Sequence, residues 1–146
     1  MIRFETDDCP MPEFNHAHIA GWIRIIVASH GKKAGEINYL FCSDAQILKH
    51  NKLYLEHDFY TDIITFDYSE NEWISGDIFI GIETVASNAA QLGLNTDLEL
   101  LRVIIHGILH LCGFKDKTSE TESIMHQQED IALSYFYYIV NLYQTS

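Results

Sequence analysis

The chain has 146 residues, of which 47% are hydrophobic and 12% aromatic, and its 21 acidic and 9 basic residues give a formal net charge of −12. This length suits one domain and is short for two, so we expect residues 1–146 to form a single domain with its own core. The negative charge argues against binding nucleic acid through a broad basic face, unless a metal ion or another macromolecule supplies the attraction.

The cysteines and the apolar segments indicate in which compartment the protein is expected to work. The three cysteines, Cys9, Cys42 and Cys112, are odd in number and widely spaced, which favours reduced thiols over a disulfide framework or a zinc knuckle. The N-terminal "MIRFETDD" lacks the apolar core of a signal peptide. The longest apolar stretch, "HIAGWIRIIVA", is too short to span a bilayer and contains Arg24. We therefore expect a cytoplasmic protein without a membrane partner.

The apolar periodicity predicts strands and helices in mixed order along the chain. The first half is expected to hold a strand at 2–5, a helix at 15–29 stopped by Gly31, a strand at 36–43, and a helix from Ser43 or Asp44 to about Asn51. The second half is expected to hold strands at 61–68 and 76–82, a helix at 83–93, and a helix at 96–112 with Thr96 and Glu99 as a capping box. A last helix, from "TSETES" to about Tyr143, begins with another capping box. The predicted class is α+β, a small mixed sheet of about four strands covered by helices.

The stretch "HGILHLCGFKDK", residues 106–117, carries the candidate site. His106 and His110 project from one face of a helix about one turn apart, as two ligands of one ion require. Gly113 lets the chain leave the helix and can return Asp116 toward the histidines as a third ligand. Three protein ligands leave a position open for water, which predicts a catalytic site for one divalent transition metal, with Zn²⁺ expected, on a central helix and the loop after it. The alternative is a core helix with two hydrogen-bonded histidines and a surface turn.

The residue after the first histidine limits the chemistry. Zinc peptidases need a glutamate there as general base, and this chain has Gly107, so peptidase activity is not expected. The H-x-x-x-H-x-x-G-x-x-D spacing nevertheless resembles the metzincin ligand pattern and predicts a metzincin-like cleft. The water on the metal held by His106, His110 and Asp116 would be the nucleophile. No protein acid or base is assigned.

The same stretch resembles the H-G-x-L-H-L-x-G-Y-D-H signature of the YbeY family of endoribonucleases. Residues 54–66, "YLEHDFYTDIITF", resemble the family's upstream Y-R-x-x-D-x-P-T-D-V-L-S-F, and Gly76, Asp77 and Ile78 match its G-D-I strand. The resemblance implies a single α+β domain with a three-ligand metal in a cleft beside the sheet. It implies a metal-dependent, single-strand-specific endoribonuclease that matures the 3′ end of small-subunit (16S) rRNA and acts in late ribosome quality control, with ribosomal or ribosome-assembly proteins as partners.

Carried over by position, the resemblance makes His106 and His110 ligands and places Asp116 where the family usually has histidine. It places a possible substrate cleft at Thr61, Asp62, Thr65 and Asp77, beside which Lys115 and Lys117 either contact RNA or form a solvated turn. Two departures remove positive charge from the site: Asp116 lowers the formal charge of a divalent site, and Leu55 stands where the family has an arginine suited to phosphate.

Two other functions stay open. A non-catalytic ribosome-assembly factor with a metal-stabilised loop fits the charge of −12 and Leu55. A non-haem iron oxygenase shares the ligand set of two histidines and a carboxylate, but nothing else in the sequence suggests an organic co-substrate. The aromatic residues of the last helix are expected to be buried rather than to stack on bases.

Overall fold

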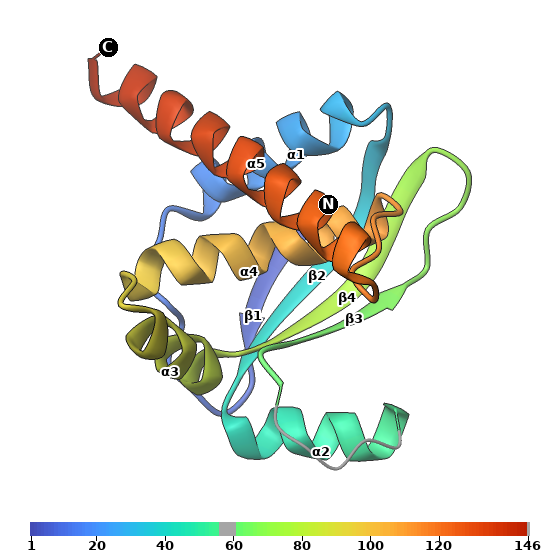
Figure 1. Ribbon diagram of the computed structural model, residues 1–146, viewed down its shortest axis with the longest axis vertical. Helices are drawn as coiled ribbons and strands as arrows, with labels where there is room; N and C mark the ends of the chain where they lie inside the picture. The colour runs from blue at the N-terminus through green and yellow to red at the C-terminus, as the bar shows by residue number, and fades with distance from the viewer. Residues whose placement is uncertain (56–60, 146) are drawn as a thin grey trace.

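The structure is a computed structural model that describes the backbone of residues 1–55 and 61–145 and the side chains of residues 1–53 and 61–141. Four strands and five helices lie within these residues (Figure 1). In chain order they are β1 (Ile2–Thr6), α1 (His16–Ser29), β2 (Lys33–Cys42), α2 (Asp44–Leu55), β3 (Ile63–Asp67), β4 (Trp73–Gly81), α3 (Ile82–Leu92), α4 (Thr96–Leu111) and α5 (Ser119–Thr145).

The strands form one mixed sheet in the order β1-β2-β4-β3. β1 and β4 pair with β2 in parallel, and β3 is an antiparallel edge strand beside β4. The register sets Tyr39 opposite Ile78 and Ile78 opposite Thr65. The predicted class, a mixed α+β sheet of four strands with helices around it, is confirmed.

The main core lies between one face of the sheet and the helices α1 and α4. Alternate residues of a strand point to opposite faces, so the buried Ile37, Tyr39 and Phe41 of β2 and the buried Ile78 and Ile80 of β4 line this face. They pack against apolar residues of α1 and α4, among them Trp22, Ile23, Ile104 and Ile108. α2 covers part of the opposite face, where Ile47 packs with Cys42 and Ile64 in a separate small cluster.

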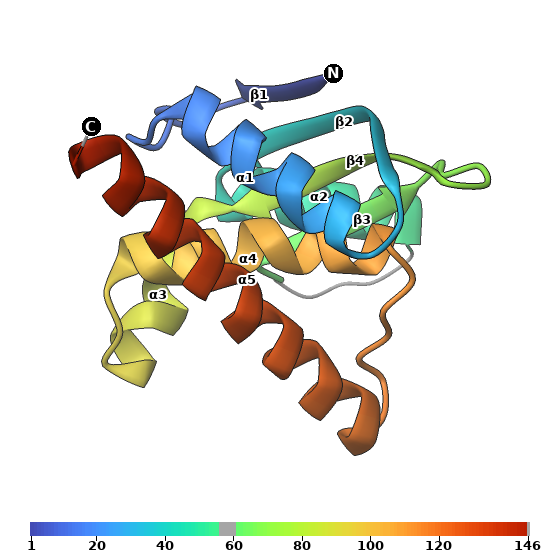
Figure 2. The ribbon, with the colours of Figure 1, turned by 90° about the horizontal axis from the view of Figure 1, so that it is seen from above.

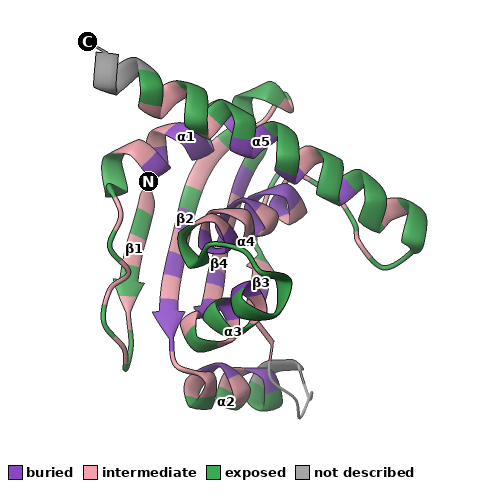
Figure 3. Cartoon of the chain, turned by 60° about the vertical axis from the view of Figure 1, so that its left-hand side comes forward, coloured by how far each residue is buried: buried purple, intermediate pink, exposed green. Residues whose placement is uncertain are grey.

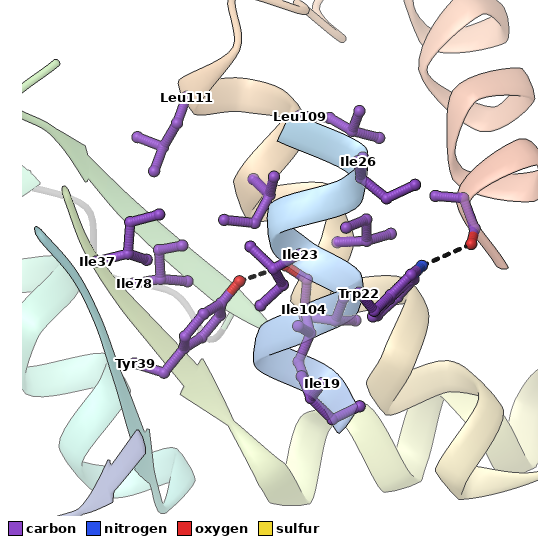
Figure 4. Close-up of a cluster of buried hydrophobic side chains, with 14 of the residues drawn as sticks. Ile19, Trp22, Ile23, Ile26, Ile37, Tyr39, Ile78, Ile104, Leu109 and Leu111 are labelled. Carbon is purple, nitrogen blue, oxygen red and sulfur yellow. Dashed lines mark hydrogen bonds between the residues drawn. The ribbon is translucent and has the colours of Figure 1, made fainter. Parts of the chain in front are cut away.

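Two buried aromatic side chains tie the helices to one another and to the sheet (Figure 4). The Tyr39 hydroxyl donates a hydrogen bond of 2.8 Å to the carbonyl of Ile104, which fixes the middle of α4 against β2. The Trp22 indole donates a hydrogen bond of 2.7 Å to the carbonyl of Ala132, which fixes α5 against α1. α5 therefore crosses both α1 and α4 at a set position (Figures 1 and 2).

Several predicted boundaries shift. β2 and β4 each begin three residues before the expected start. The side chain that caps α4 is that of Asn95, whose Oδ1 accepts hydrogen bonds from the amides of Asp97 and Leu98. The capping box assigned to Thr96 and Glu99 is therefore wrong, and Glu99 is buried. The expected box at α5 is present, because Thr118 and Thr121 each accept a hydrogen bond from the other's backbone amide.

The expected burial of the aromatic residues on the last helix is wrong for three of them. Tyr135, Tyr137 and Tyr138 are about half exposed or more, and the buried positions of α5 alternate with exposed ones along its length (Figure 3). Phe136 instead packs edge-on against Trp22. α5 lies on α1 and α4 rather than on the sheet, so only one side of it is covered. Within residues 1–55 and 61–145, no helix combines the length and apolar character needed to cross a bilayer.

Candidate metal centre

α4 brings two histidines to the rim of the core. Its apolar side packs on the sheet so closely that a Cβ on Gly107 would lie 3.0 Å from the Cδ1 of Ile78 and 3.1 Å from that of Ile63. His106 and His110 flank this contact and stay partly exposed, with 19% and 28% of their side chains accessible. Their imidazole groups thus lie at the edge of the packed interface between α4 and the sheet, where a ligand can reach them from solvent.

The loop after α4 returns a carboxylate to both rings. Gly113 adopts φ +105°, a conformation that favours glycine, and the amide of Phe114 bonds back to the carbonyl of Leu109. Asp116 then places its Oδ2 3.2 Å from His106 Nε2 and 3.3 Å from His110 Nε2. The two Nε2 atoms are 3.0 Å apart.

These three atoms have the spacing of metal ligands. Ligands at about 2.0 Å from a tetrahedral zinc ion lie about 3.3 Å from one another. His106, His110 and Asp116 form the one group of three or more histidine, cysteine or acidic residues in the described part of the chain whose ligand atoms converge closely enough to hold an ion. The donor set of two imidazoles and a carboxylate suits a divalent transition metal.

The outer nitrogen of each ring is also held. His106 Nδ1 lies 2.6 Å from Oε2 of Glu129, and His110 Nδ1 lies 3.0 Å from the carbonyl oxygen of Phe114. Both partners accept, so each Nδ1 carries the hydrogen and each Nε2 keeps its lone pair for an ion. Metal-binding histidines in proteins are oriented in this way.

Sequence reasoning did not identify Glu129. It lies on α5, is 2% exposed, and is itself held by Arg102 at 3.0 Å and His126 at 3.2 Å. Arg102 also binds Asp130 through its other terminal nitrogen at 3.2 Å. One signal was available: Glu129 stands four residues after the buried Met125 and three before the buried Ala132, on the apolar stripe of a helix. A carboxylate in such a position needs a partner.

The electrostatics of the cluster follow from this pairing. Burial by itself would lower the pKa of His106, but the hydrogen bond and charge of Glu129 raise it above its usual value. Burial and the charge of His106 lower the pKa of His110. Burial would raise the pKa of Glu129, and its hydrogen bonds from His106 and Arg102 lower it instead. The contact with Glu129 therefore favours the protonated form of His106 and the ionised form of Glu129.

A cleft of about 250 Å³ opens beside the cluster. It is lined by Asp62, just before β3, by Ile63 at the start of β3, by Glu99, Arg102, Val103 and His106 from α4, by Asp116, and by His126 and Glu129 from α5. Burial raises the pKa of both Asp62 and Glu99. The cleft is thus bordered by several carboxyl groups and has apolar walls at Ile63 and Val103.

The structure brings together some of the residues expected in the cleft and separates others. Asp62 lines it, while Thr61 donates a hydrogen bond from its hydroxyl to the carbonyl of Ile63. Thr65 lies two residues after Ile63 in β3 and so on the side of the sheet that faces α4. Lys115 and Lys117 are exposed on either side of Asp116.

Asp77 lies elsewhere. Its neighbours Gly76 and Ile78 face α4, so Asp77 points to the opposite face of the sheet, where its carboxylate accepts a hydrogen bond from Asn38 at 3.2 Å. We therefore leave Asp77 out of the cleft beside His106. The side chain of Leu55, at the end of α2, lies outside the described side chains.

Fold and site together define a small α+β protein whose cleft can hold a divalent metal between a helix and the following loop. The model of the family Endoribonuclease YbeY matches residues 2–137. Endoribonuclease YbeY of Phocaeicola vulgatus is 52% identical over 134 residues, covering 92% of this chain and 97% of that protein, and that of Bacteroides thetaiotaomicron is 49% identical over 133 residues, covering 91% and 97%. The chain belongs to the YbeY family of endoribonucleases.

A solved structure shows the same fold. The solution structure of a protein from Thermotoga maritima superposes with a TM-score of 0.63 at 25% sequence identity, covering 93% of this chain and 91% of that one. The resemblance read from the signature around His106 and from the G-D-I strand is therefore confirmed at the level of the family.

Proposed function

We propose that this protein is a metal-dependent endoribonuclease for single-stranded RNA, working as a single domain, with His106, His110 and Asp116 as its metal ligands. The observation that carries the proposal is the convergence of the three ligand atoms at the rim of a cleft. Membership of the family supports RNA as the substrate. The ligand spacing on a helix and its following loop resembles that of metzincins, and we propose a comparable cleft here.

The chain's own residues set the geometry of the reaction. His106, His110 and Asp116 would hold a divalent ion, for which we propose zinc, and that ion would supply an activated water and polarise a phosphoryl oxygen. His106 and His110 present Nε2 to it, because Glu129 and the carbonyl of Phe114 hold each Nδ1. Asp116 contributes a negative charge and so makes the site less electrophilic than three neutral ligands would. For Lys115 and Lys117, exposed on the same loop, we propose contact with RNA phosphates rather than a role as a solvated turn.

For the substrate we propose the small-subunit rRNA precursor, processed at its 3′ end during late quality control in the cytoplasm. The net charge of −12 and the carboxyl groups of the cleft oppose free RNA. Association with ribosomal or ribosome-assembly proteins would overcome this repulsion by presenting the RNA strand to the metal. Activity should therefore be greater on the immature subunit than on naked RNA.

The test compares the wild type with His106→Ala, purified without an affinity tag. We expect about one transition-metal ion per chain in the wild type, in keeping with one three-ligand site, and loss of both the ion and RNA cleavage in the variant. His16→Ala, at the start of α1 and away from the cluster, is the matched control and should keep both. Wild-type cleavage by His106→Ala with an unchanged thermal transition would refute the proposal.

The acidic cleft also favours a second function, a ribosome-assembly factor that does not cleave RNA. Asp62, Glu99 and Asp116 all border the place where a phosphodiester would have to bind. Under this alternative, the metal only fixes the loop after α4. Normal ribosome association by His106→Ala, together with no cleavage by the metal-loaded wild type, would select it.

A further inference from the structure

One carboxylate of the cleft does not contact the group of His106, His110 and Asp116. Glu99 lies seven residues before His106 on α4, two turns away on the same face, and lines the cleft. It is 6% exposed, and its Oε2 is buried without a hydrogen-bond partner among the described residues. A buried acceptor of this kind costs stability unless a donor reaches it.

The neighbouring cation does not satisfy Glu99. Arg102 lies one turn away, but its two terminal nitrogens bind Glu129 and Asp130. Asp62, on the β3 side of the cleft, adds a second carboxyl group. The donors that line the cleft, on Arg102, His106 and His126, are already paired with carboxylates. The group left without a partner beside the metal ligands is therefore an acceptor, Oε2 of Glu99, and it fits a ligand group that donates hydrogen bonds.

We propose that Glu99 is a specificity residue that binds the base of the nucleotide next to the scissile phosphate, and that this base is guanine. The inference rests on the proposed function, because it assumes that a phosphodiester binds at the metal cluster. The negative charges of Glu99 and Asp62 favour a base over a phosphate in this part of the cleft. A base can enter, since Ile63 and Val103 provide apolar walls beside Glu99.

The choice of guanine follows from hydrogen-bonding chemistry. Unpaired bases expose their Watson–Crick edges, which single-strand-specific proteins read. Guanine presents two adjacent donors there, N1–H and N2–H, which match the two oxygens of a carboxylate. Adenine and cytosine present a donor beside an acceptor, and uracil presents one donor between two acceptors. The terminal torsion of a glutamate is broad, so a small rotation of Glu99 turns both oxygens toward the cleft.

The experiment measures binding of four ribonucleoside 5′-monophosphates to the zinc-loaded protein by calorimetry. We expect guanosine monophosphate to bind at least about fivefold more tightly than the other three, as a bidentate contact to a base implies. Glu99→Gln replaces one acceptor by a donor, so it should lose this preference and gain affinity for the adenine or cytosine nucleotide. Asp97→Asn, exposed in the first turn of α4, is the matched control and should behave as the wild type.

A second measurement separates loss of the site from loss of the fold. Because Glu99→Gln removes a buried carboxylate without a partner, its thermal transition should be equal to or higher than that of the wild type. Equal affinity of the wild type for all four nucleotides, no binding of any, or a guanine preference kept in Glu99→Gln would overturn the inference. A guanine preference without RNA cleavage would instead refute the proposed function and leave the base site standing. Equal binding of the 2′-deoxy form is expected, because the contact is to the base.

Discussion

His106 and Glu129 are joined by a contact of 2.6 Å between Nδ1 and Oε2, although 23 residues separate them in the chain. The contact links α4, which carries two candidate ligands, to α5, which carries none. Because Glu129 is buried and also held by Arg102, its carboxylate fixes the direction of the His106 ring rather than following it. The group of candidate metal ligands is thus supported by α5, a helix that follows it in the sequence.

Replacing Glu129 should weaken metal binding without removing a ligand. We expect Glu129→Ala to lower zinc affinity about 10-fold to 100-fold, as loss of an orienting carboxylate does at histidine ligands. Competition with a chromophoric chelator measures the affinity directly. Asp130→Asn removes the other partner of Arg102 but leaves His106 untouched, so it should bind zinc like the wild type. Equal affinity in wild type and Glu129→Ala would show that the contact does not orient the ligand.

Metal binding should depend on pH in a way set by His106. The pKa of this imidazole lies above its usual value of 6.5. Because Nδ1 is bonded to Glu129, protonation of His106 adds its proton to the same Nε2 that the ion needs. Affinity should therefore fall as pH falls through that raised pKa. Glu129→Ala removes the charge that raises the pKa, so the fall should begin at a lower pH than in the wild type. A zinc titration across the range where imidazole titrates checks both curves, and an unshifted onset in the variant would contradict the assignment.

Exchanging Asp116 should change the reactivity of the ion. Asp116→His would replace an anionic ligand by a neutral one and raise the formal charge of a divalent site from about +1 to +2. A more electrophilic ion acidifies the attacking water further, so the acidic limb of the pH–rate profile for RNA cleavage should move to lower pH. Asp116→Ala is the control for loss of a ligand and should lose metal and activity together. A profile for Asp116→His that coincides with the wild type would exclude this electrostatic role.

Gly76 should tolerate no side chain. A Cβ there would collide with the carbonyl oxygen of Phe66 and lie 3.0 Å from a methyl group of Leu111, because α4 packs directly over this point of β4. Gly76→Ala should lower the free energy of unfolding by about 1–3 kcal/mol. Gly21→Ala in α1, where nothing lies within 4 Å of the added carbon, should instead stabilise the fold by up to about 1 kcal/mol. Thermal or urea unfolding of the two variants should give shifts of opposite sign.

Much of the fold could be predicted because its elements are periodic. The helices at His16–Ser29 and Thr96–Leu111 carry apolar residues at helical spacing, and residues such as Asn15, Gly93 and Gly113 mark element ends by their own conformational preferences. The cap of α4 was misassigned because Asn95 and Thr96 are both good capping residues, and only the backbone conformation chooses between them. The strand order was not predicted, since pairing partners far apart in the chain leave no local signal.

The candidate site was likewise predictable from the sequence only in part. His106, His110 and Asp116 could be named together because a helix turn and a glycine exit relate them over eleven residues. Asp77 was assigned to the cleft from its position in the family pattern. The sequence shows that Asp77 differs in face from Gly76 and Ile78, but only the structure shows which face of β4 is covered by α4. Leu55 and Asp116 could be recognised as departures from the family pattern without any structure.

By itself the sequence determined the features that depend on neighbours along the chain: the helix that presents two imidazoles on one side, the turn that returns a carboxylate, and the family. Only the tertiary structure decided what surrounds them. Glu129 meets His106 because the contact of Trp22 with Ala132 sets where α5 crosses α1. Glu99 lines the cleft and takes no part in a capping box, since Asn95 caps α4. Contacts of this kind join residues far apart in the chain, and their positions follow from the packing of whole helices rather than from any local preference.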